Sequence, residues 1–295
     1  MEWQQILGFY HLARLGSFTQ AAAATWRTQS ALSQQIKALE EEWQCQLVER
    51  LGRRRLRLTP AGERFYNFCK AILARQEQWH DELHELQQFP QGRLSLAAPF
   101  TTLYHLAGPP LQQFRQAFPQ VQVTILDRSQ TQVVELVKAG EVDFGVALNN
   151  AAPPNLAVWR WRPVEVFLMV PAGHPLGQKQ PVTLEDIAGY PLILPPKSPK
   201  ARRRHALEEA MQQRGLTYQV VMESSNVELS SLYVEMGVGL SFATMVPGLN
   251  LAAARRLELL SLRHYFEPDH LAVLARKDKA LTSCRRAFLD LLLGG

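Results

Sequence analysis

Residues 25–40 decide the fold of this chain, and they read TWRTQSALSQQIKALE. Apolar residues recur at Leu32, Ile36 and Leu39, which is the spacing of an amphipathic helix. The opposite edge of this helix carries short hydrogen-bonding side chains and one lysine. Its members are Thr28, Gln29, Ser30, Ser33, Gln34 and Lys37. Taken alone, the helix fits two interpretations equally: a capped surface helix packed on a core, or a helix whose polar edge contacts a molecule outside the protein.

The flanking segments place this helix in a larger motif. A stripe of apolar residues from Ile6 to Ala13 predicts a helix that Gly16 ends, and Ser17 is a good N-cap for the next short helix, FTQAAAAT. A three-residue connection, residues 26–28, leads into the polar-edged helix, so the pair predicts a helix-turn-helix. Beyond it, LVER and LRLT predict two short strands around a basic turn, which together form a wing.

Positive charge is concentrated in that turn. The net charge of +5 is modest, but residues 50–57, RLGRRRLR, hold five arginines and no acid, a cluster suited to phosphate. A helix that enters the major groove presents its N-terminal turn to base edges and phosphates, so it needs short polar side chains there. We therefore expect Gln29 and Gln34 to pair with base edges and Thr28 or Ser30 to contact phosphate. The full set of predicted DNA contacts is Arg27, Thr28, Gln29, Ser30, Ser33, Gln34, Lys37, Arg53, Arg54 and Arg55.

A long helix follows the wing. Pro60 starts it, and no breaker interrupts it before about Phe89. Its apolar residues form a heptad seam with one polar member, Gln76. The seam consists of Phe65, Cys69, Ile72, Gln76, Trp79, Leu83 and Leu86. The pattern predicts pairing with a second copy of the chain through residues 60–89, and the alternative is a helix that lies on its own domain.

The pattern of apolar and polar residues changes at residue 90. Short apolar runs then alternate with helical segments, which predicts βαβ units with mixed or parallel sheets. About 200 residues of this kind exceed one small sheet, so we expect two lobes. Lobe I would span about 92–161 and 268–295, and lobe II about 162–267.

Specific motifs in the first 62 residues resemble those of LysR-type transcriptional regulators. They are Ser17-Phe18-Thr19-x-Ala21-Ala22, Gln29-Ser30-Ala31-Leu32-Ser33-x-Gln35-Ile36-x-x-Leu39-Glu40 and Leu58-Thr59-Pro60-Ala61-Gly62. Segments such as GEVDFGV and GVGL extend the resemblance through the chain. Thr25, Trp26, Arg27 and the pair Trp43-Gln44 depart from the usual pattern around the recognition helix.

The resemblance implies a multidomain protein that binds promoter DNA. The expected parts are a winged helix-turn-helix over 1–59, a dimerising linker helix over 60–89 and a periplasmic-binding-protein-like α/β effector domain of two lobes over 90–295. Members of the family commonly assemble as tetramers, and a small metabolite in the cleft between the lobes alters how they bend DNA.

The resemblance also places effector contacts after the strands of this domain. The expected residues are Pro99, Phe100, Thr101, Thr102, Ser129, Thr131, Ser198, Lys200 and Asn226. Hydroxyls at a helix N-terminus suit an anion, although each of these residues also fits a helix cap. Residues 202–204 are three arginines that could attract an acidic effector, but a solvated helix face is the simpler interpretation.

Enzyme chemistry is the competing interpretation. The sequence contains no phosphate-binding loop, HExxH or GxSxG motif, and we expect no catalytic residue, metal or cofactor. His80 and His84 lie four residues apart on the long helix, which a solvated face explains better than a metal site. The alternative function is a two-lobed solute-binding or small-acid-metabolising protein whose N-terminal helices only oligomerise. Without a visible signal peptide or a long apolar segment, we expect a cytoplasmic protein with no membrane partner.

Overall fold

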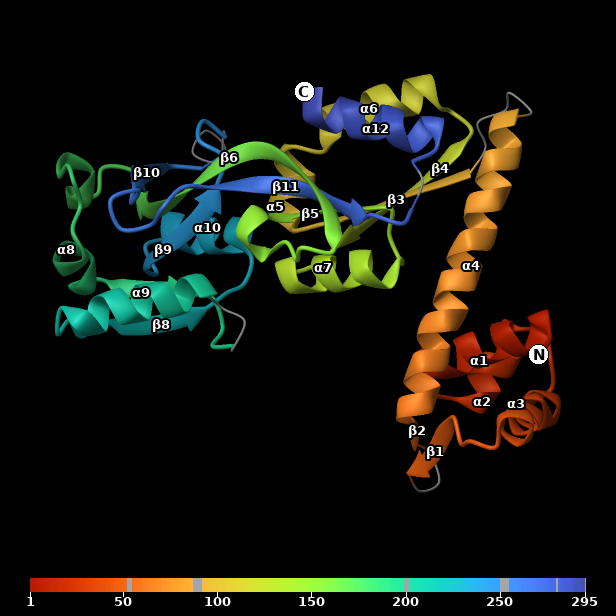
Figure 1. The fold of residues 1–295 in the computed structure, drawn as a ribbon. Helices are drawn as coiled ribbons and strands as arrows, with labels where there is room; N and C mark the ends of the chain where they lie inside the picture. The colour runs from red at the N-terminus through yellow and green to blue at the C-terminus, as the bar shows by residue number, and fades with distance from the viewer. Residues whose placement is uncertain (52–54, 87–91, 199–201, 250–254, 280, 295) are drawn as a thin grey trace. The chain divides into compact units, whose positions relative to one another are not determined.

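The computed structural model describes the chain except for residues 52–54, 87–91, 199–201, 250–254, 280 and 295 (Figure 1). The chain divides into two compact units, residues 1–89 and residues 90–295.

The first unit begins with the predicted helix-turn-helix. Its helices are α1 (Trp3–Leu15), α2 (Phe18–Ala24) and α3 (Gln29–Trp43). Ser17 caps α2 by accepting a hydrogen bond from the Gln20 amide, and Thr28 caps α3 by accepting one from the Ala31 amide at 3.2 Å. The connection runs from residue 25 to 28, one residue longer than predicted, because Thr25 ends α2. The three helices share one apolar core, which confirms the predicted motif.

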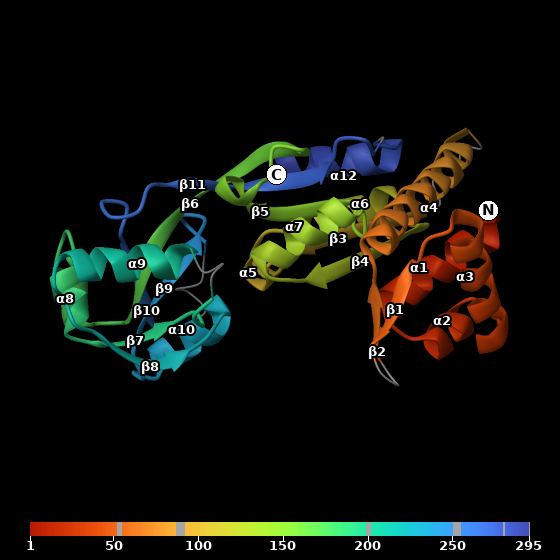
Figure 2. The ribbon, with the colours of Figure 1, turned by 60° about the horizontal axis from the view of Figure 1, so that its bottom comes forward.

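The predicted wing is also present (Figure 2). Strands β1 (Val48–Leu51) and β2 (Arg55–Leu58) pair antiparallel, with Val48 opposite Leu58. The Glu40 carboxylate of α3 accepts hydrogen bonds from the Leu47 and Val48 amides at 2.7 and 3.1 Å, so the wing is fastened to the recognition helix.

Helix α4 (Pro60–Leu86) follows directly, as predicted. Gly62 allows a very close approach, since a Cβ there would lie 2.0 Å from the Leu47 carbonyl oxygen. Phe65 and Cys69 are buried in the core of their own unit, and burial raises the pKa of the Cys69 thiol to about 12. The prediction that these two residues face a second helix is therefore wrong. Trp79, two heptads after Phe65, is 54% exposed.

The second unit starts with a layered α/β half. Its elements are β3 (Gly92–Ala98), α5 (Phe100–His105), α6 (Gly108–Ala117), β4 (Val121–Asp127), α7 (Gln130–Ala139), β5 (Phe144–Leu148), η1 (Asn149–Ala151), β6 (Leu156–Pro171), β11 (Asp269–Arg276) and α12 (Ser283–Gly294). Strand β3 pairs parallel with β4 and β5, and β11 pairs antiparallel with β5 and β6. Helices α6 and α12 cover one face of these strands and α7 the other (Figure 1).

The other half repeats this layered plan. Its elements are η2 (Pro175–Gln178), α8 (Leu184–Ala188), β7 (Pro191–Leu194), α9 (Arg202–Gln213), β8 (Gln219–Glu223), α10 (Val227–Glu235), β9 (Leu240–Met245) and β10 (Leu257–Ser261). Strand β7 runs parallel to β8 and β9, and β6 is antiparallel to β9 and β10. Helices α8 and α9 pack into one apolar cluster and α10 into another.

Strands β6 and β11 connect the two halves. The first part of β6, up to Val164, pairs with β11, and the part from Glu165 to Met169 pairs with β9. Asp269, which begins β11, lies opposite Val164. The strand order across both halves is β4-β3-β5-β11-β6-β9-β7-β8. The predicted lobe limits, 161/162 and 267/268, fall close to this crossing and stay a prediction.

Candidate DNA interface and effector cleft

Helix α3 has two faces of opposite character. Leu32, Ile36 and Leu39 are at most 2% exposed and pack against α1 and α2. The predicted contacts on the other face are accessible. Thr28, Gln29, Ser30, Gln34 and Lys37 are exposed, and Arg27 and Ser33 are half-buried. The core thus holds the helix while the polar edge stays accessible to another molecule.

Part of this polar edge is already engaged within the protein. The Thr28 hydroxyl lies 3.1 Å from the Ser30 hydroxyl, besides capping α3. Lys37 is 3.4 Å from the Glu41 carboxylate one turn later, and both side chains remain well exposed. Such an exposed pair is weak, so Lys37 can exchange it for a phosphate.

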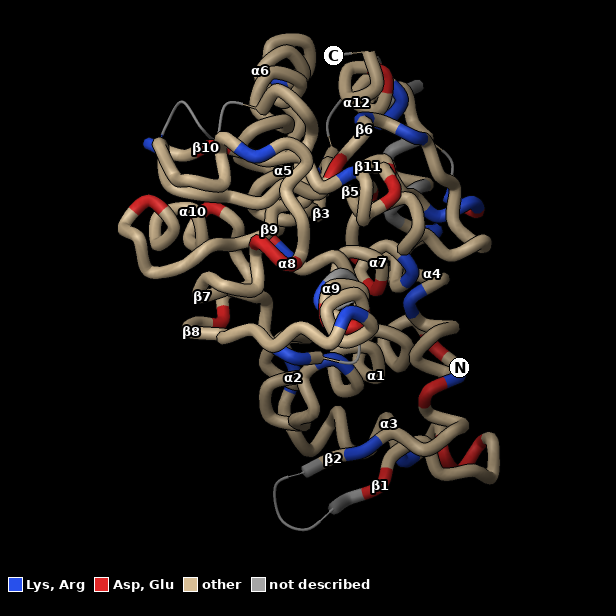
Figure 3. The backbone as a smooth tube through the Cα atoms, turned by 90° about the vertical axis from the view of Figure 1, so that its left-hand side faces the viewer, with Lys and Arg blue, Asp and Glu red and all other residues tan. Residues whose placement is uncertain are grey.

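The wing extends the basic character of this surface. Of the predicted arginines, Arg53 and Arg54 lie outside the described residues, and for Arg55 the structure describes only the backbone, in β2. Arg57, on the same strand, is exposed. Figure 3 shows a blue stretch of Lys or Arg on β2. Arg57 belonged to the arginine-rich run but was missing from the predicted contacts. Period-two alternation along the strand, with Leu56 and Leu58 facing the core, was the signal that identifies it.

The second unit contains a cleft with a volume of about 1190 Å³. It opens where β3, β4 and β5 end, and α10 and β9 also line it. The structure brings most of the predicted effector contacts to this cleft. Those that line it are Pro99, Phe100, Thr101, Thr102, Ser129, Thr131 and Asn226. Ser198 is not among the lining residues, and Lys200 lies outside the described residues.

Two of these side chains act as helix caps. Ser129 forms a capping box with Gln132 at the start of α7, and the Asn226 side chain accepts a hydrogen bond from the Leu229 amide at 3.1 Å in α10. Thr101 differs, since within the described residues its hydroxyl has no hydrogen-bond partner. The hydroxyls of Thr102 and Thr131 likewise have no partner among these residues, so all three threonines can donate to a ligand.

Arg204 does not lie on the solvated helix face expected for residues 202–204. It lines the cleft and is 4% exposed, so the predicted solvated face is wrong for this residue. Its guanidinium donates to the Pro195 carbonyl, to Glu208 at 2.9 Å and to Glu223 at 2.6 Å. The hydrogen bond from Arg204 lowers the pKa of Glu208, which stays ionised. Arg204 therefore holds α9 against β7 and β8. The side chains of Arg202 and Arg203 lie outside the described set.

Two further polar residues of this region were not predicted. The Gln130 side chain accepts a hydrogen bond from the Leu148 amide at 2.8 Å, which ties α7 to the end of β5. His105 Nε2 lies 2.6 Å from Glu228 Oε1, which joins α5 to α10 across the two halves. The partners are 123 residues apart, so no local pattern could have paired them.

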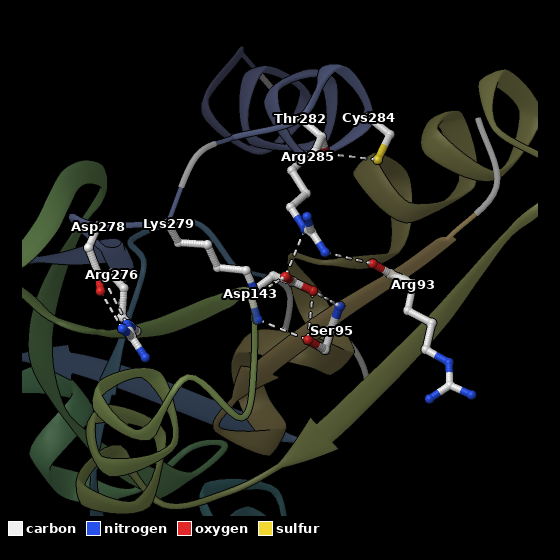
Figure 4. A network of polar contacts seen from close by, with 9 residues as sticks. All are labelled: Arg93, Ser95, Asp143, Arg276, Asp278, Lys279, Thr282, Cys284 and Arg285. Atoms are coloured by element: carbon white, nitrogen blue, oxygen red, sulfur yellow. Dashed lines mark hydrogen bonds and ion pairs between the residues drawn. The ribbon is translucent and has the colours of Figure 1, made fainter. Parts of the chain in front are cut away.

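A buried charge cluster lies at the opposite end of the β5 strand (Figure 4). Asp143, which is 4% exposed, pairs with Lys279 at 2.6 Å and Arg285 at 2.8 Å. Ser95 donates to the same carboxylate from its amide and its hydroxyl, both at 2.7 Å. Burial alone would raise the pKa of Asp143, but the two cations and the hydrogen bonds lower it below its usual range.

The described residues contain no cluster of three His, Cys, Asp or Glu side chains able to hold a metal ion. Of His80 and His84, only His80 has a described side chain, and it is exposed. Nor does the described part of the chain include a helix long and apolar enough to cross a membrane.

Comparison with known proteins matches both units. The model of the bacterial regulatory helix-turn-helix protein, lysR family, matches residues 3–63, and that of the LysR substrate binding domain matches residues 87–295. The regulator CysB of Burkholderia cenocepacia is 29% identical over 287 residues, covering 94% of this chain and 88% of CysB. The transcriptional activator CmpR of Synechocystis is 30% identical over 290 residues, covering 96% of this chain and 92% of CmpR.

A solved structure shares the fold over the whole length. Full-length CbnR in complex with its target DNA superposes with a TM-score of 0.64 at 19% identity, covering 99% of each chain. The substrate-binding domain model alone accounts for more than half of the present chain. The chain therefore belongs to the LysR family of transcriptional regulators, which are not enzymes, and it binds DNA through its helix-turn-helix and an effector through its substrate-binding domain.

Proposed function

We propose that this protein binds promoter DNA sequence-specifically through α3 and the wing, and that a small anionic metabolite in the cleft controls it. The observation that carries the DNA half is the division of α3. A fully buried apolar face fixes the helix, and the exposed edge presents amides, hydroxyls and a lysine. Gln29 and Gln34 have the donor and acceptor geometry to pair with adenine in the major groove.

Hydroxyl groups support an anion in the cleft. Thr101, Thr102 and Thr131 line it together with Ser225 and Thr244, and hydroxyls donate well to an oxyanion. The apolar part of the lining includes Phe100, Phe242, Phe266 and Met245. We therefore propose a ligand with one oxyanion group and an apolar portion, larger than an inorganic anion.

Self-association completes the proposal. Trp79 lies beyond the part of α4 that packs in its own unit, and it is 54% exposed. Trp79 continues the heptad spacing of the sequence, so a second α4 would cover its exposed side chain. We propose a dimer through residues 60–89, with tetramers formed from such dimers.

DNA binding in a salt series tests the regulator directly. The full chain is titrated with its own upstream region and with random duplex of equal length. Gln29→Ala should weaken binding to the upstream region about tenfold and leave binding to random duplex unchanged, because it removes a base contact. Arg57→Ala should weaken both and lower the salt slope, because it removes a phosphate contact. Equal affinity of the wild-type protein for both duplexes would exclude sequence-specific binding.

Ligand-induced thermal stabilisation tests the cleft. Sulfate, acetate and benzoate are added to the full chain as probes. Benzoate should raise the melting temperature most, since it combines an oxyanion with an apolar ring. Equal stabilisation by all three would contradict the proposed two-part ligand.

A further inference from the structure

Trp26 is the most exposed large apolar residue in the described part of the chain. Its exposed fraction is 96%, although burial of a tryptophan would ordinarily stabilise a fold. It lies between α2 and α3, immediately before the residues that begin the polar edge.

The backbone at Trp26 is held in an unfavourable conformation. Its φ of 55° lies in the left-handed region, where glycine or asparagine fits with less strain. In the described residues, Gln44 is the only other non-glycine with a positive φ. A bulky aromatic residue in such a conformation is a reason to look for a function.

The surrounding turn is tied to α2 by hydrogen bonds that hold the backbone at Trp26. The Trp26 amide donates to the Ala23 carbonyl at 3.2 Å, and the Arg27 amide donates to the Ala22 carbonyl at 2.9 Å. The Thr25 hydroxyl donates to the Ala21 carbonyl at 2.9 Å. These bonds fix the position from which the side chain projects into solvent.

The position of this turn indicates the partner. When the N-terminus of a recognition helix enters the major groove, the residues just before it lie at the edge of the groove, beside the sugar–phosphate backbone. Arg27, Thr28 and Gln29 continue from Trp26 into the proposed DNA-contacting edge.

We propose that Trp26 contacts the backbone of the bound DNA, with the indole face against a deoxyribose and the Nε1–H donating to a phosphate oxygen. The inference rests on the proposed function of α3 as the recognition helix. An indole is neutral, so this contact contributes affinity without releasing a counterion.

Trp26→Gly separates folding from binding. Glycine relieves the left-handed backbone, so the melting temperature should stay equal or rise. Affinity for the upstream region and for random duplex should fall together, by about tenfold, as expected for a lost hydrogen bond to a charged group. The salt slope should stay unchanged. Trp26→Phe should show a smaller loss, because it keeps a flat ring and loses the N–H.

Gln44→Gly is the matched control. It also relieves a left-handed residue, with a φ of 49°, but lies at the other end of α3. Its DNA affinity should equal that of the wild-type protein. Equal change in both glycine variants would assign the effect to the backbone and overturn the proposal.

Other results would overturn it as well. A loss confined to the upstream region would indicate a base contact, and a lower melting temperature of Trp26→Gly would indicate that the indole packs within the protein. Unchanged DNA affinity with altered sedimentation would identify a protein partner. If wild-type and Trp26→Gly protein bind DNA equally well, only this inference is excluded. If the wild-type protein binds no DNA, the proposed function is excluded too.

Discussion

At the amino end of β5, Asp143 is buried between Lys279 and Arg285 and accepts two hydrogen bonds from Ser95. At the carboxyl end of the same strand, the neighbouring strands β3 and β4 lead to Thr101 and Thr131, which line an open cleft with neutral hydroxyls. Both ends are polar, yet one end is closed and the other is accessible.

The difference follows from what each end must stabilise. A charge buried without partners would cost several kcal/mol, so the carboxylate at the amino end carries two cations and its own donors. The hydroxyls at the carboxyl end are neutral and half-exposed, so they can lack a hydrogen-bond partner within the protein at little cost in stability. The carboxyl ends of the strands in an α/β sheet are also where ligands ordinarily bind. The closed end therefore contributes stability and the open end contributes recognition.

Removal of the buried carboxylate should have the largest effect. Asp143→Ala leaves Lys279 and Arg285 without their shared anion, and we expect a loss of about 3–5 kcal/mol in the free energy of unfolding. Urea denaturation of the full chain measures it. Asp127→Ala, at the exposed end of β4, is the control, and its effect should stay within about 0.5 kcal/mol. Similar losses in both variants would refute the distinction between the two ends.

A fall in pH should reduce the stability that Asp143 contributes at the amino end of β5. The folded pKa of Asp143 lies below its unfolded value, so its contribution to stability is present above the unfolded pKa, about 3.9, and is lost as the pH falls through the lower folded pKa. Asp143→Asn should therefore be less stable than wild type at neutral pH, and the gap should narrow below about pH 4. Urea denaturation at several pH values checks this. A gap that stays constant to about pH 2 would contradict the assigned shift.

Removal of one hydroxyl at the open end should affect binding and spare stability. Thr101→Ala should weaken binding of the oxyanion probe about tenfold, since a hydrogen bond to a charged group is lost. The melting temperature without ligand and the affinity for DNA should stay unchanged. Ser198→Ala is the matched control, because Ser198 is not among the residues that line the cleft. A loss of probe affinity in Ser198→Ala as large as that in Thr101→Ala would argue that the cleft is not the binding site.

The first unit was predictable from the sequence because its signals are local. The caps at Ser17 and Thr28, Pro60 at the start of α4 and the apolar spacing of α3 each act within one or two turns. The heptad seam was misjudged at Phe65 and Cys69, since periodicity identifies an apolar face without identifying what covers it.

Most of the predicted cleft residues came from the family resemblance, and their position after successive strands brought them together. The same sequence determined the fold class, the helix-turn-helix and wing, and the hydroxyl-bearing residues after β3 and β4. Only the tertiary structure decided which charged side chains are buried and which partners they have. The buried Arg204 forms an ion pair with Glu223, and Asp143 forms one with Arg285 from the last helix. His105 meets Glu228 across 123 residues. A burial partner so distant in sequence leaves no periodic or capping signal, because it is set by how the sheets and helices pack.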